Sequence, residues 1–414
     1  MKQLPPDDFG GSFNEKRGEA HMRILHTADW HLGKTLEGRS RLKEQEDFLE
    51  ELARIVKDEK IDAVIMAGDA FDTVNPPALA EQLFYESLSA LSDKGNRPVV
   101  VIAGNHDNPD RLSAASPLTT DHGIHLIGYP RTAPVDIEVA SSGEILSVAA
   151  LAYPSESRLN EVLSETFDEK LLRDQYDEKI KQTFQRMCSK ARKDAVQIAA
   201  SHIYVAGGSQ TDSERPIEVG GAYTVAAESL PENAAYVALG HLHRPQTIKR
   251  ARTLARYSGS PLAYSFSEAG YAKSVTIVEA APGQTASWEE VHLTSGKPLV
   301  KWKAEKGMSQ VYSWLEEERD KNAWIDLEIH LTDQLSIEEI HRLRKARQGI
   351  IHIRPVFEEA ASAEEKTRSR NVPIEERFKA FYERQTGGAV PDEETVKLFL
   401  ELASGSEQEE GDET

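Results

Sequence analysis

The sequence predicts an α/β fold followed by a small α+β unit and a pair of helices. Three strand-then-helix units follow one another early in the chain, and this order favours an α/β sheet over a helical bundle. Polar residues come directly after several of the apolar runs. Open α/β sheets present ligands at the carboxyl ends of their strands, so we expect the chemistry there.

The strands of the main domain are expected where β-branched or apolar runs occur, at 23–28, 62–67, 99–102, 196–200, 236–239 and 274–279. A helix is expected at 42–57, where apolar residues recur at helical spacing. A second should have Pro76 and Pro77 in its first turn and end near Gly95. A third, charged helix is expected at about 159–193. The Gly- and Ser-rich stretch 207–221 is typical of a surface loop.

Composition limits the class of protein. With 414 residues, 39% hydrophobic and 29% charged, the chain can form two or three globular domains. No apolar run approaches the ~20 residues of a membrane span, so no membrane is expected. The single cysteine, Cys188, excludes an internal disulfide and fits the cytoplasm. The net charge of −20 argues against a uniformly basic nucleic-acid surface but leaves room for a basic patch or for bound metal ions.

The strand ends supply a set of carboxylates, imidazoles and one amide: Asp29, His31, Asp69, Asn105, His106, His202, His241 and His243. Alternate residues of an extended segment point the same way, so Asp29 with His31 can address one centre. This ligand set suits Mn, Fe or Zn. One such histidine alone is more often a hydrogen-bonded core residue, and Gly104-Asn105-His106-Asp107 alone could be a polar turn. The recurrence at five strand ends favours a metal centre.

These five segments resemble the signature motifs of the calcineurin-like metallophosphoesterases, whose fold is a sandwich of mixed sheets flanked by helices. Three further features resemble one branch of that family, the nuclease subunits of bacterial SbcC–SbcD complexes: LHTADWHLGKTLEGRSRLKEQEDFLEEL from Leu25, YSGSPLAYSFSEAGYAKSV from Tyr257, and a paired-helix tail. The similarity extends from Met22 to about Ala403.

The resemblance implies two divalent metal ions, in the first place Mn²⁺. One would be held by Asp29, His31, Asp69 and His243, and the other by Asp69, Asn105, His202 and His241. His106 would stabilise the transition state and protonate the leaving oxygen, and Asp107 could orient or charge-stabilise that imidazole. We interpret Asp72 as a turn residue. His26, His122 and His125 lie outside the motifs and are expected to be structural.

The implied activity is that of a DNA nuclease, an exonuclease on duplex ends and an endonuclease on single strands and hairpins, acting with the SbcC ATPase in break repair. In the implied reaction, a water molecule activated by the metal ions would attack a phosphodiester in line. Two alternatives stay open: another phosphoesterase of the family that acts on a small molecule, and a scaffold without activity. The extra modules argue against the first, and the intact ligand set argues against the second.

A basic run follows the first metal motif, and one arginine follows the third. These residues are Lys34, Arg39, Arg41, Lys43 and Arg111. They are expected either to contact DNA phosphates or to lie on solvated helix faces.

The chain is expected to divide into a disordered extension at 1–21, a nuclease domain at 22–280, a capping domain at 281–358, a linker at 359–372, a helix pair at 373–403 and an acidic tail at 404–414. In the capping domain we expect strands at 324–331 and 349–353 and a helix at 336–347 with Ser336 as its cap. By resemblance this domain helps to select DNA geometry.

The helix pair carries apolar residues on one face of each helix: Ile374, Phe378, Phe381, Tyr382, Val396, Phe399 and Leu400. Two short helices cannot bury such faces alone, so they either fold back onto the domains or bind a partner. By resemblance the partner is the base of the SbcC coiled coil. A homodimer within a heterotetramer, associated with the nucleoid, is likewise implied only by resemblance.

Overall fold

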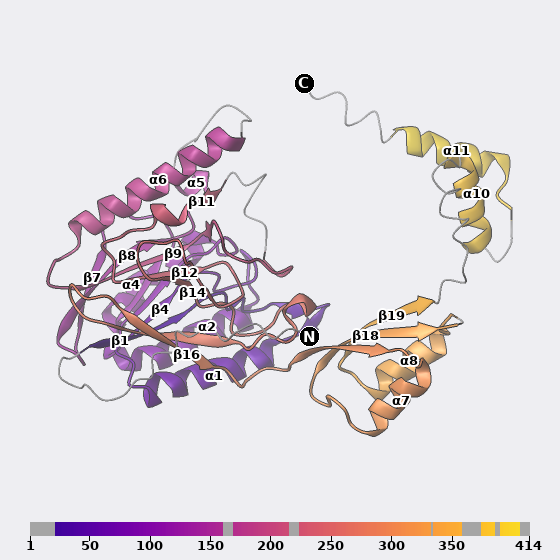
Figure 1. The fold of residues 1–414 in the computed structure, drawn as a ribbon, viewed down its shortest axis with the longest axis horizontal. Coiled ribbons are helices and arrows are strands. Elements are labelled where there is room, and N and C mark those ends of the chain that lie inside the picture. Colours follow the sequence, from indigo (N-terminus) through magenta and orange to yellow (C-terminus); the bar gives the residue numbers. More distant parts are fainter. Residues whose placement is uncertain are drawn as a thin grey trace. The chain divides into compact units, whose positions relative to one another are not determined.

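The computed structural model describes residues 21–159, 169–214, 223–332, 334–357, 374–385 and 390–405. The expected linker lies outside these residues, as do all but the last residue of the expected disordered extension and most of the acidic tail. The fold class expected from the sequence is confirmed: two mixed sheets carry helices and are followed by a small α+β unit and two helices (Figure 1).

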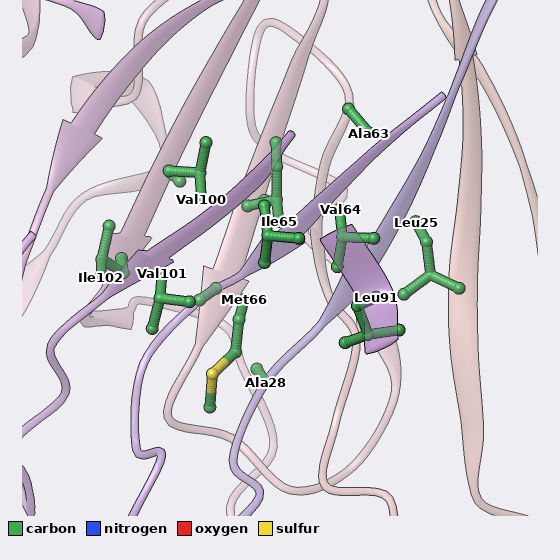
Figure 2. Close-up of a cluster of buried hydrophobic side chains, with 14 of the residues drawn as sticks. Leu25, Ala28, Ala63, Val64, Ile65, Met66, Leu91, Val100, Val101 and Ile102 are labelled. Atoms are coloured by element: carbon green, nitrogen blue, oxygen red, sulfur yellow. The ribbon is translucent and has the colours of Figure 1, made fainter. Parts of the chain in front are cut away.

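The first sheet has six strands in the order β16-β15-β1-β4-β5-β6. Its parallel part consists of β1 (Met22–Thr27), β4 (Ala63–Met66), β5 (Val99–Ile102) and β6 (Ile124–Ile127). The strands β15 (Ser274–Ala280) and β16 (Ser287–His292) extend it in antiparallel fashion. Every residue of β4 and β5 is buried, because the sheet is covered on both faces (Figure 2).

The second sheet has the order β13-β14-β12-β9-β8-β7. Four of its strands are parallel: β8 (Glu144–Leu151), β9 (Val196–His202), β12 (Tyr236–Gly240) and β14 (Ala255–Tyr257). The strands β7 (Val135–Val139) and β13 (Gln246–Thr247) close its two edges in antiparallel fashion. The carboxyl ends of β9 and β12 therefore lie side by side.

Alternation along β9 shows how the layers pack. Ile198 and Ala200 belong to the core shared with the first sheet, whereas Ala199 faces a second core. The helices α1 (Leu42–Asp58) and α2 (Ala78–Ser92) contribute to the first core, and α6 (Glu169–Lys190) covers the second. Each fully buried large apolar side chain contributes about 1.5–3 kcal/mol, so this double core fixes the strand ends firmly.

The helix boundaries differ in detail from those expected. Pro77 precedes α2 as its N-cap instead of lying in its first turn, and the helix ends at Ser92 because Asp93 adopts a left-handed conformation with φ 46°. The long helix expected at 159–193 is described as α5 (Glu156–Leu159) and α6, with the segment between them outside the described residues.

The small α+β unit contains the expected strand β18 (Trp324–Leu331), the helix α8 (Ile337–Ala346) and the strand β19 (Ile350–Phe357). Ser336 caps α8, since its side chain accepts a hydrogen bond from the Glu339 backbone N–H. Two elements were not predicted from the sequence: β17 (Leu299–Ala304), which pairs in parallel with β18, and α7 (Met308–Glu316) between them. The signal available in the sequence was the apolar character of Leu299, Trp302 and Ala304, which are the buried residues of β17.

The helices α10 (Ile374–Gln385) and α11 (Glu393–Gly405) pack against each other. Phe378 and Phe399 stack with ring centroids 4.1 Å apart, and Val396 is buried, whereas Ile374 stays 55% exposed. The side chain of Phe381 lies outside the described part of the structure. Among the residues that the structure describes, no helix combines the length and the apolar character needed to cross a membrane.

Candidate metal centre

The carboxyl ends of β1, β4, β5, β9 and β12 bring the predicted ligands together. Four of these residues have left-handed backbones that non-glycine residues seldom adopt: Asp29 (φ 56°), His31 (47°), Asp69 (53°) and His241 (105°). Backbone hydrogen bonds of 3.0 Å from Asp29 to the Gly68 carbonyl and from His31 to the Asp69 carbonyl support two of them. Strain of this kind is typical of sites where side chains must be aimed.

Asp69 lies at the centre of the cluster. Its Oδ2 lies 3.4 Å from Nε2 of His202, 3.7 Å from Nε2 of His31 and 4.0 Å from Nε2 of His106. Gly104 permits this crowding, because a Cβ at that position would come within 2.0 Å of Oδ1 of Asp69. The loops after β4 and β5 are therefore in direct contact.

The side-chain nitrogen and oxygen atoms converge in three groups that could each hold a metal ion: Asp29 with His31 and His243, Asp29 with Asp69 and His202, and His31 with Asp69 and His106. Asn105 adjoins the second group, since its Oδ1 lies 2.8 Å from Nε2 of His202. His241 is in none of the three; its ring centroid lies 5.4 Å from that of His202.

The protonation states of two histidines suit a bound cation. Burial lowers the pKa values of His31 and His241 well below their ordinary range, so these imidazoles are neutral and can donate lone pairs. Burial also raises the pKa of Asp29 to about 7, which shows how unfavourable its charge is without a cation nearby. Nε2 of His31 and Nε2 of His243 face each other at 3.0 Å, an arrangement that suits two ligands of one ion. The residues thus fit divalent metal.

His106 is held differently from the other histidines. Its Nδ1 donates a hydrogen bond of 2.6 Å to the carbonyl oxygen of Asp72, and its side chain is 10% exposed, compared with 1% for His31 and 0% for His202. Its Nε2 therefore faces Asp69 at the accessible side of the cluster.

Asp107 hydrogen-bonds to the backbone, so it does not orient the His106 imidazole directly. Its carboxylate accepts hydrogen bonds from the backbone N–H groups of Ala70, Phe71 and Gly104, at 2.8–3.2 Å, and the partner of the His106 imidazole is the Asp72 carbonyl instead. Asp107 therefore joins the loop after β4 to the loop after β5. Asp72 likewise does more than form a turn, because its carboxylate binds Lys34 at 2.8 Å.

Arg158 was not predicted from the sequence. Its guanidinium donates to the carbonyl oxygens of Gly104 and Asp107, at 2.8 and 2.5 Å, and so holds the two ends of the loop that carries Asn105 and His106. No motif marks this residue, since it comes from α5, about fifty positions further along the chain.

The basic residues divide into two kinds. Arg41 is 1% exposed and its guanidinium is bound by Glu44 and the Ala263 carbonyl, so the expected phosphate contact is wrong for this residue. Lys43 and Arg111 are exposed and paired with acidic neighbours, Lys34 is paired with Asp72, and Arg39 lies on the short strand β3 (Arg39–Ser40).

The histidines outside the motifs belong to none of the three groups. His26 is buried and its Nδ1 lies 2.9 Å from the hydroxyl of Tyr236 in the core between the sheets, while His122 lies on the surface.

Comparison with known proteins agrees with this geometry. The profile of the calcineurin-like phosphoesterases matches residues 22–245, and that of the type 5 capsule protein repressor C-terminal domain matches residues 295–386.

The SbcD subunit of nuclease SbcCD from Bacillus subtilis strain 168 is 79% identical over 94% of this chain and 100% of its own length. The proteins of the same name from Rhodobacter capsulatus and Escherichia coli K12 are 34% and 31% identical, over 69% and 81% of this chain and 72% and 83% of their own lengths. The chain therefore belongs to the calcineurin-like phosphoesterases and, within them, to the family of SbcD subunits of the SbcCD nuclease.

Proposed function

We propose that this protein is a DNA nuclease that uses two divalent metal ions, in the first place Mn²⁺, and acts with an SbcC ATPase. The observation that carries the proposal is the position of Asp69, which two of the three donor groups share while His106 faces it from the accessible side. When bound, two such ions supply Lewis acidity that activates water and neutralises charge on a phosphate.

The ligands proposed for one ion are Asp29, His31, Asp69 and His243, and those proposed for the other are Asp69, Asn105, His202 and His241. The left-handed backbones at Asp29 and Asp69 aim the two carboxylates into the cluster. Asp107 and Arg158 then fix the loop of Asn105 and His106 against it.

The proposed role of His106 follows from its hydrogen bond. A carbonyl oxygen can only accept, so Nδ1 carries the hydrogen that is donated to Asp72. Nε2 is then the nitrogen that faces the centre and can deliver a proton to the leaving oxygen of a phosphodiester. The greater exposure of His106 compared with His31 and His202 leaves it within reach of a substrate.

DNA is the proposed substrate because the relatives are named as nuclease subunits and because the chain carries a second module beyond the metal centre. We propose exonuclease activity on duplex ends and endonuclease activity on single strands and hairpins. Lys34, Arg39, Lys43 and Arg111 are the proposed phosphate contacts. The domain division at 22–280, 281–358, 359–372 and 373–403 also remains a proposal, except that β16 pairs with β15 and so belongs to the sheet of the first domain.

One assay tests the substrate. Blunt duplex, hairpin DNA and a small aryl phosphodiester are incubated with the full chain and Mn²⁺, with and without SbcC and ATP, and with EDTA as the metal-free control. We expect cleavage of both DNA substrates, stimulation by SbcC with ATP, and loss of activity in EDTA. Turnover of the small diester alone would instead assign a small-molecule phosphodiesterase.

The proposed site for SbcC is the apolar face of α10 and α11. Ile374 and Leu398 are 55% and 57% exposed, but only Ile374 belongs to that face, so the two residues form a matched pair. We expect deletion of 373–414 to abolish co-purification with SbcC, and Ile374→Ser to weaken it more than Leu398→Ser. Light scattering of the purified complex would test the proposed homodimer within a heterotetramer.

A further inference from the structure

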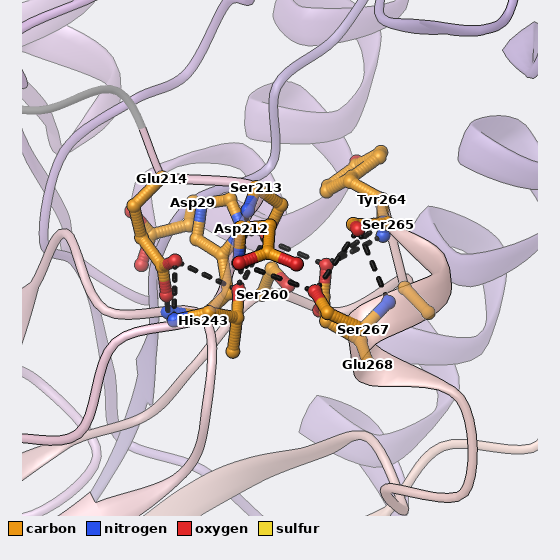
Figure 3. A network of polar contacts seen from close by, with 12 residues as sticks. Asp29, Asp212, Ser213, Glu214, His243, Ser260, Tyr264, Ser265, Ser267 and Glu268 are labelled. Atoms are coloured by element: carbon orange, nitrogen blue, oxygen red, sulfur yellow. Dashed lines mark hydrogen bonds and ion pairs between the residues drawn. The ribbon is translucent and has the colours of Figure 1, made fainter. Parts of the chain in front are cut away.

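The segment 209–214, which the sequence predicts as part of a surface loop, reaches the metal centre (Figure 3). Its start is fixed by two hydrogen bonds between the Ser209 backbone and the side chain of Gln246, at 2.8 and 2.9 Å. The Asp212 backbone N–H donates to the Ser267 hydroxyl at 3.2 Å. At its end, Oγ of Ser213 lies 2.6 Å from Nδ1 of His243.

A chain of hydrogen bonds leads from this imidazole to a carboxylate. Oγ of Ser213 lies 2.8 Å from Oγ1 of Thr211, and Oγ1 of Thr211 lies 2.7 Å from Oε2 of Glu214. Oε1 of the same carboxylate accepts the backbone N–H of His243 at 2.9 Å. Glu214 is therefore joined to His243 both directly, through the backbone, and through two hydroxyl groups.

The direction of every hydrogen bond in this chain can be assigned. A carboxylate only accepts, so Thr211 donates its single hydroxyl hydrogen to Glu214. Thr211 must then accept from Ser213, which uses the only hydroxyl hydrogen of Ser213. Ser213 can thus only accept from His243, so Nδ1 of His243 carries the hydrogen. The lone pair is left on Nε2, the atom that faces His31.

The neighbouring carboxylate of Glu268 does not take this role. Its Oε1 lies 3.9 Å from Nδ1 of His243, which is beyond hydrogen-bond distance. That oxygen already accepts the backbone N–H groups of Tyr264 and Ser265, and Oε2 is paired with Lys273. Ser213 is therefore the hydrogen-bond partner of the imidazole.

We propose that Ser213, Thr211 and Glu214 are positioning residues that hold His243 in the Nδ1–H tautomer and aim its Nε2 at a metal ion. This inference rests on the proposed metal centre. Partners of this kind orient ligating histidines and raise their basicity, and their loss typically weakens metal affinity about 10–100-fold. The two hydroxyls connect the imidazole to the carboxylate of Glu214.

The test is a Mn²⁺ titration of the full chain, with free Mn²⁺ measured by its EPR signal, so that affinity is read without DNA cleavage. We expect Ser213→Ala to bind Mn²⁺ about 10-fold more weakly. Ser213→Thr, which keeps a hydroxyl, should restore most of the affinity. Ser209→Ala makes the same change in the same segment at an exposed residue that uses only its backbone here, so its affinity should equal that of the parent.

A second variant and a second measurement separate positioning from folding. Glu214→Gln removes the charge at the end of the chain of hydrogen bonds, and we expect it to weaken binding as well. Long-range ¹H–¹⁵N NMR spectra of the metal-free chain should show His243 as the Nδ1–H tautomer, with a mixture of tautomers in Ser213→Ala. Equal affinities of the parent, Ser213→Ala and Glu214→Gln would overturn the inference and leave the proposed function standing. Equal weakening by Ser213→Ala and Ser213→Thr would also overturn it, whereas a parent that binds no Mn²⁺ would overturn both.

Discussion

The carbonyl oxygen of Asp72 lies 2.6 Å from Nδ1 of His106, which turns the other ring nitrogen toward Asp69. Two roles of His106 are compatible with this position. It can act on the substrate as a proton donor, or it can be a ligand in the group formed with His31 and Asp69.

The variant His106→Ala distinguishes these roles. We expect DNA cleavage to fall by about 10²–10⁴-fold, the usual contribution of general acid–base catalysis, while metal content stays at the parent level. Elemental analysis beside the cleavage assay gives both values. His122→Ala, a change at an exposed histidine outside the motifs, is the control and should leave both unchanged. A matching loss of metal would make His106 a ligand.

We expect Asp107→Asn to lower the stability of the fold and not to remove a catalytic group. The carboxylate accepts three backbone N–H groups, and an amide presents an NH₂ group to at least one of them. Leaving a buried N–H without a partner costs about 1–3 kcal/mol, so we expect a lower free energy of unfolding in urea. Metal affinity should also fall, because Asn105 lies in the loop that Asp107 holds. A variant with parent stability and affinity but reduced cleavage would restore the catalytic role expected from the sequence.

The strand ends could be predicted because each depends on local sequence, an apolar run followed by Asp, His or Asn. Within each sheet, parallel strands carry these ends to the same edge, so the order of elements predicts that Asp69 lies near Asn105 and that His202 lies near His243. The packing of the two sheets then brings these two sets together. Roles that depend on contacts between distant segments could not be predicted in this way. Arg158 reaches the loop of His106 from α5, and Arg41 donates to the distant carbonyl of Ala263.

The same limit applies to Asp107 and to Ser213. From the sequence, Asp107 is a neighbour of His106, and proximity along the chain suggested a contact between them. The carboxylate instead turns toward the backbone after β4, where it accepts the buried N–H groups of Ala70 and Phe71. Ser213 lies thirty residues from His243 in a segment without an apolar pattern, so no periodicity connects the two.

Glu51 predicts a pH dependence of stability. Burial acts to raise the pKa of its carboxyl, but hydrogen bonds from Ser295 and Thr294 outweigh it, and the pKa lies below its ordinary value. A lowered pKa in the folded state means that the stabilisation is present above the unfolded pKa of about 4.3 and is lost as pH falls through the folded value.

We therefore expect Glu51→Gln to lower the free energy of unfolding at pH 7 by about 1–3 kcal/mol. The difference from the parent should shrink as the pH is lowered below about 4. Urea unfolding at several pH values measures it. Glu50→Gln makes the same change at an exposed position of α1 and should show no such difference, and a gap between Glu51→Gln and the parent that is constant with pH would contradict the assignment.

Arg41 and Arg39 lie two residues apart in the basic run, but the structure predicts that replacing Arg41 affects stability whereas replacing Arg39 affects DNA binding. The guanidinium of Arg41 forms two hydrogen bonds of 2.7 and 2.8 Å with the buried carboxylate of Glu44. That carboxylate also accepts from the indole N–H of Trp324 and the backbone N–H of Lys297, so it joins α1 to the small α+β unit.

Removing one partner of a buried ion pair typically costs about 3–5 kcal/mol, because the other charge remains buried without compensation. We expect Arg41→Met to lose stability of this order in urea unfolding and to keep its affinity for duplex DNA when folded. Arg39→Met is the matched control: it should keep its stability, bind DNA more weakly and show a smaller dependence of binding on salt. Reduced DNA affinity in folded Arg41→Met, with parent stability, would return Arg41 to the set of phosphate contacts.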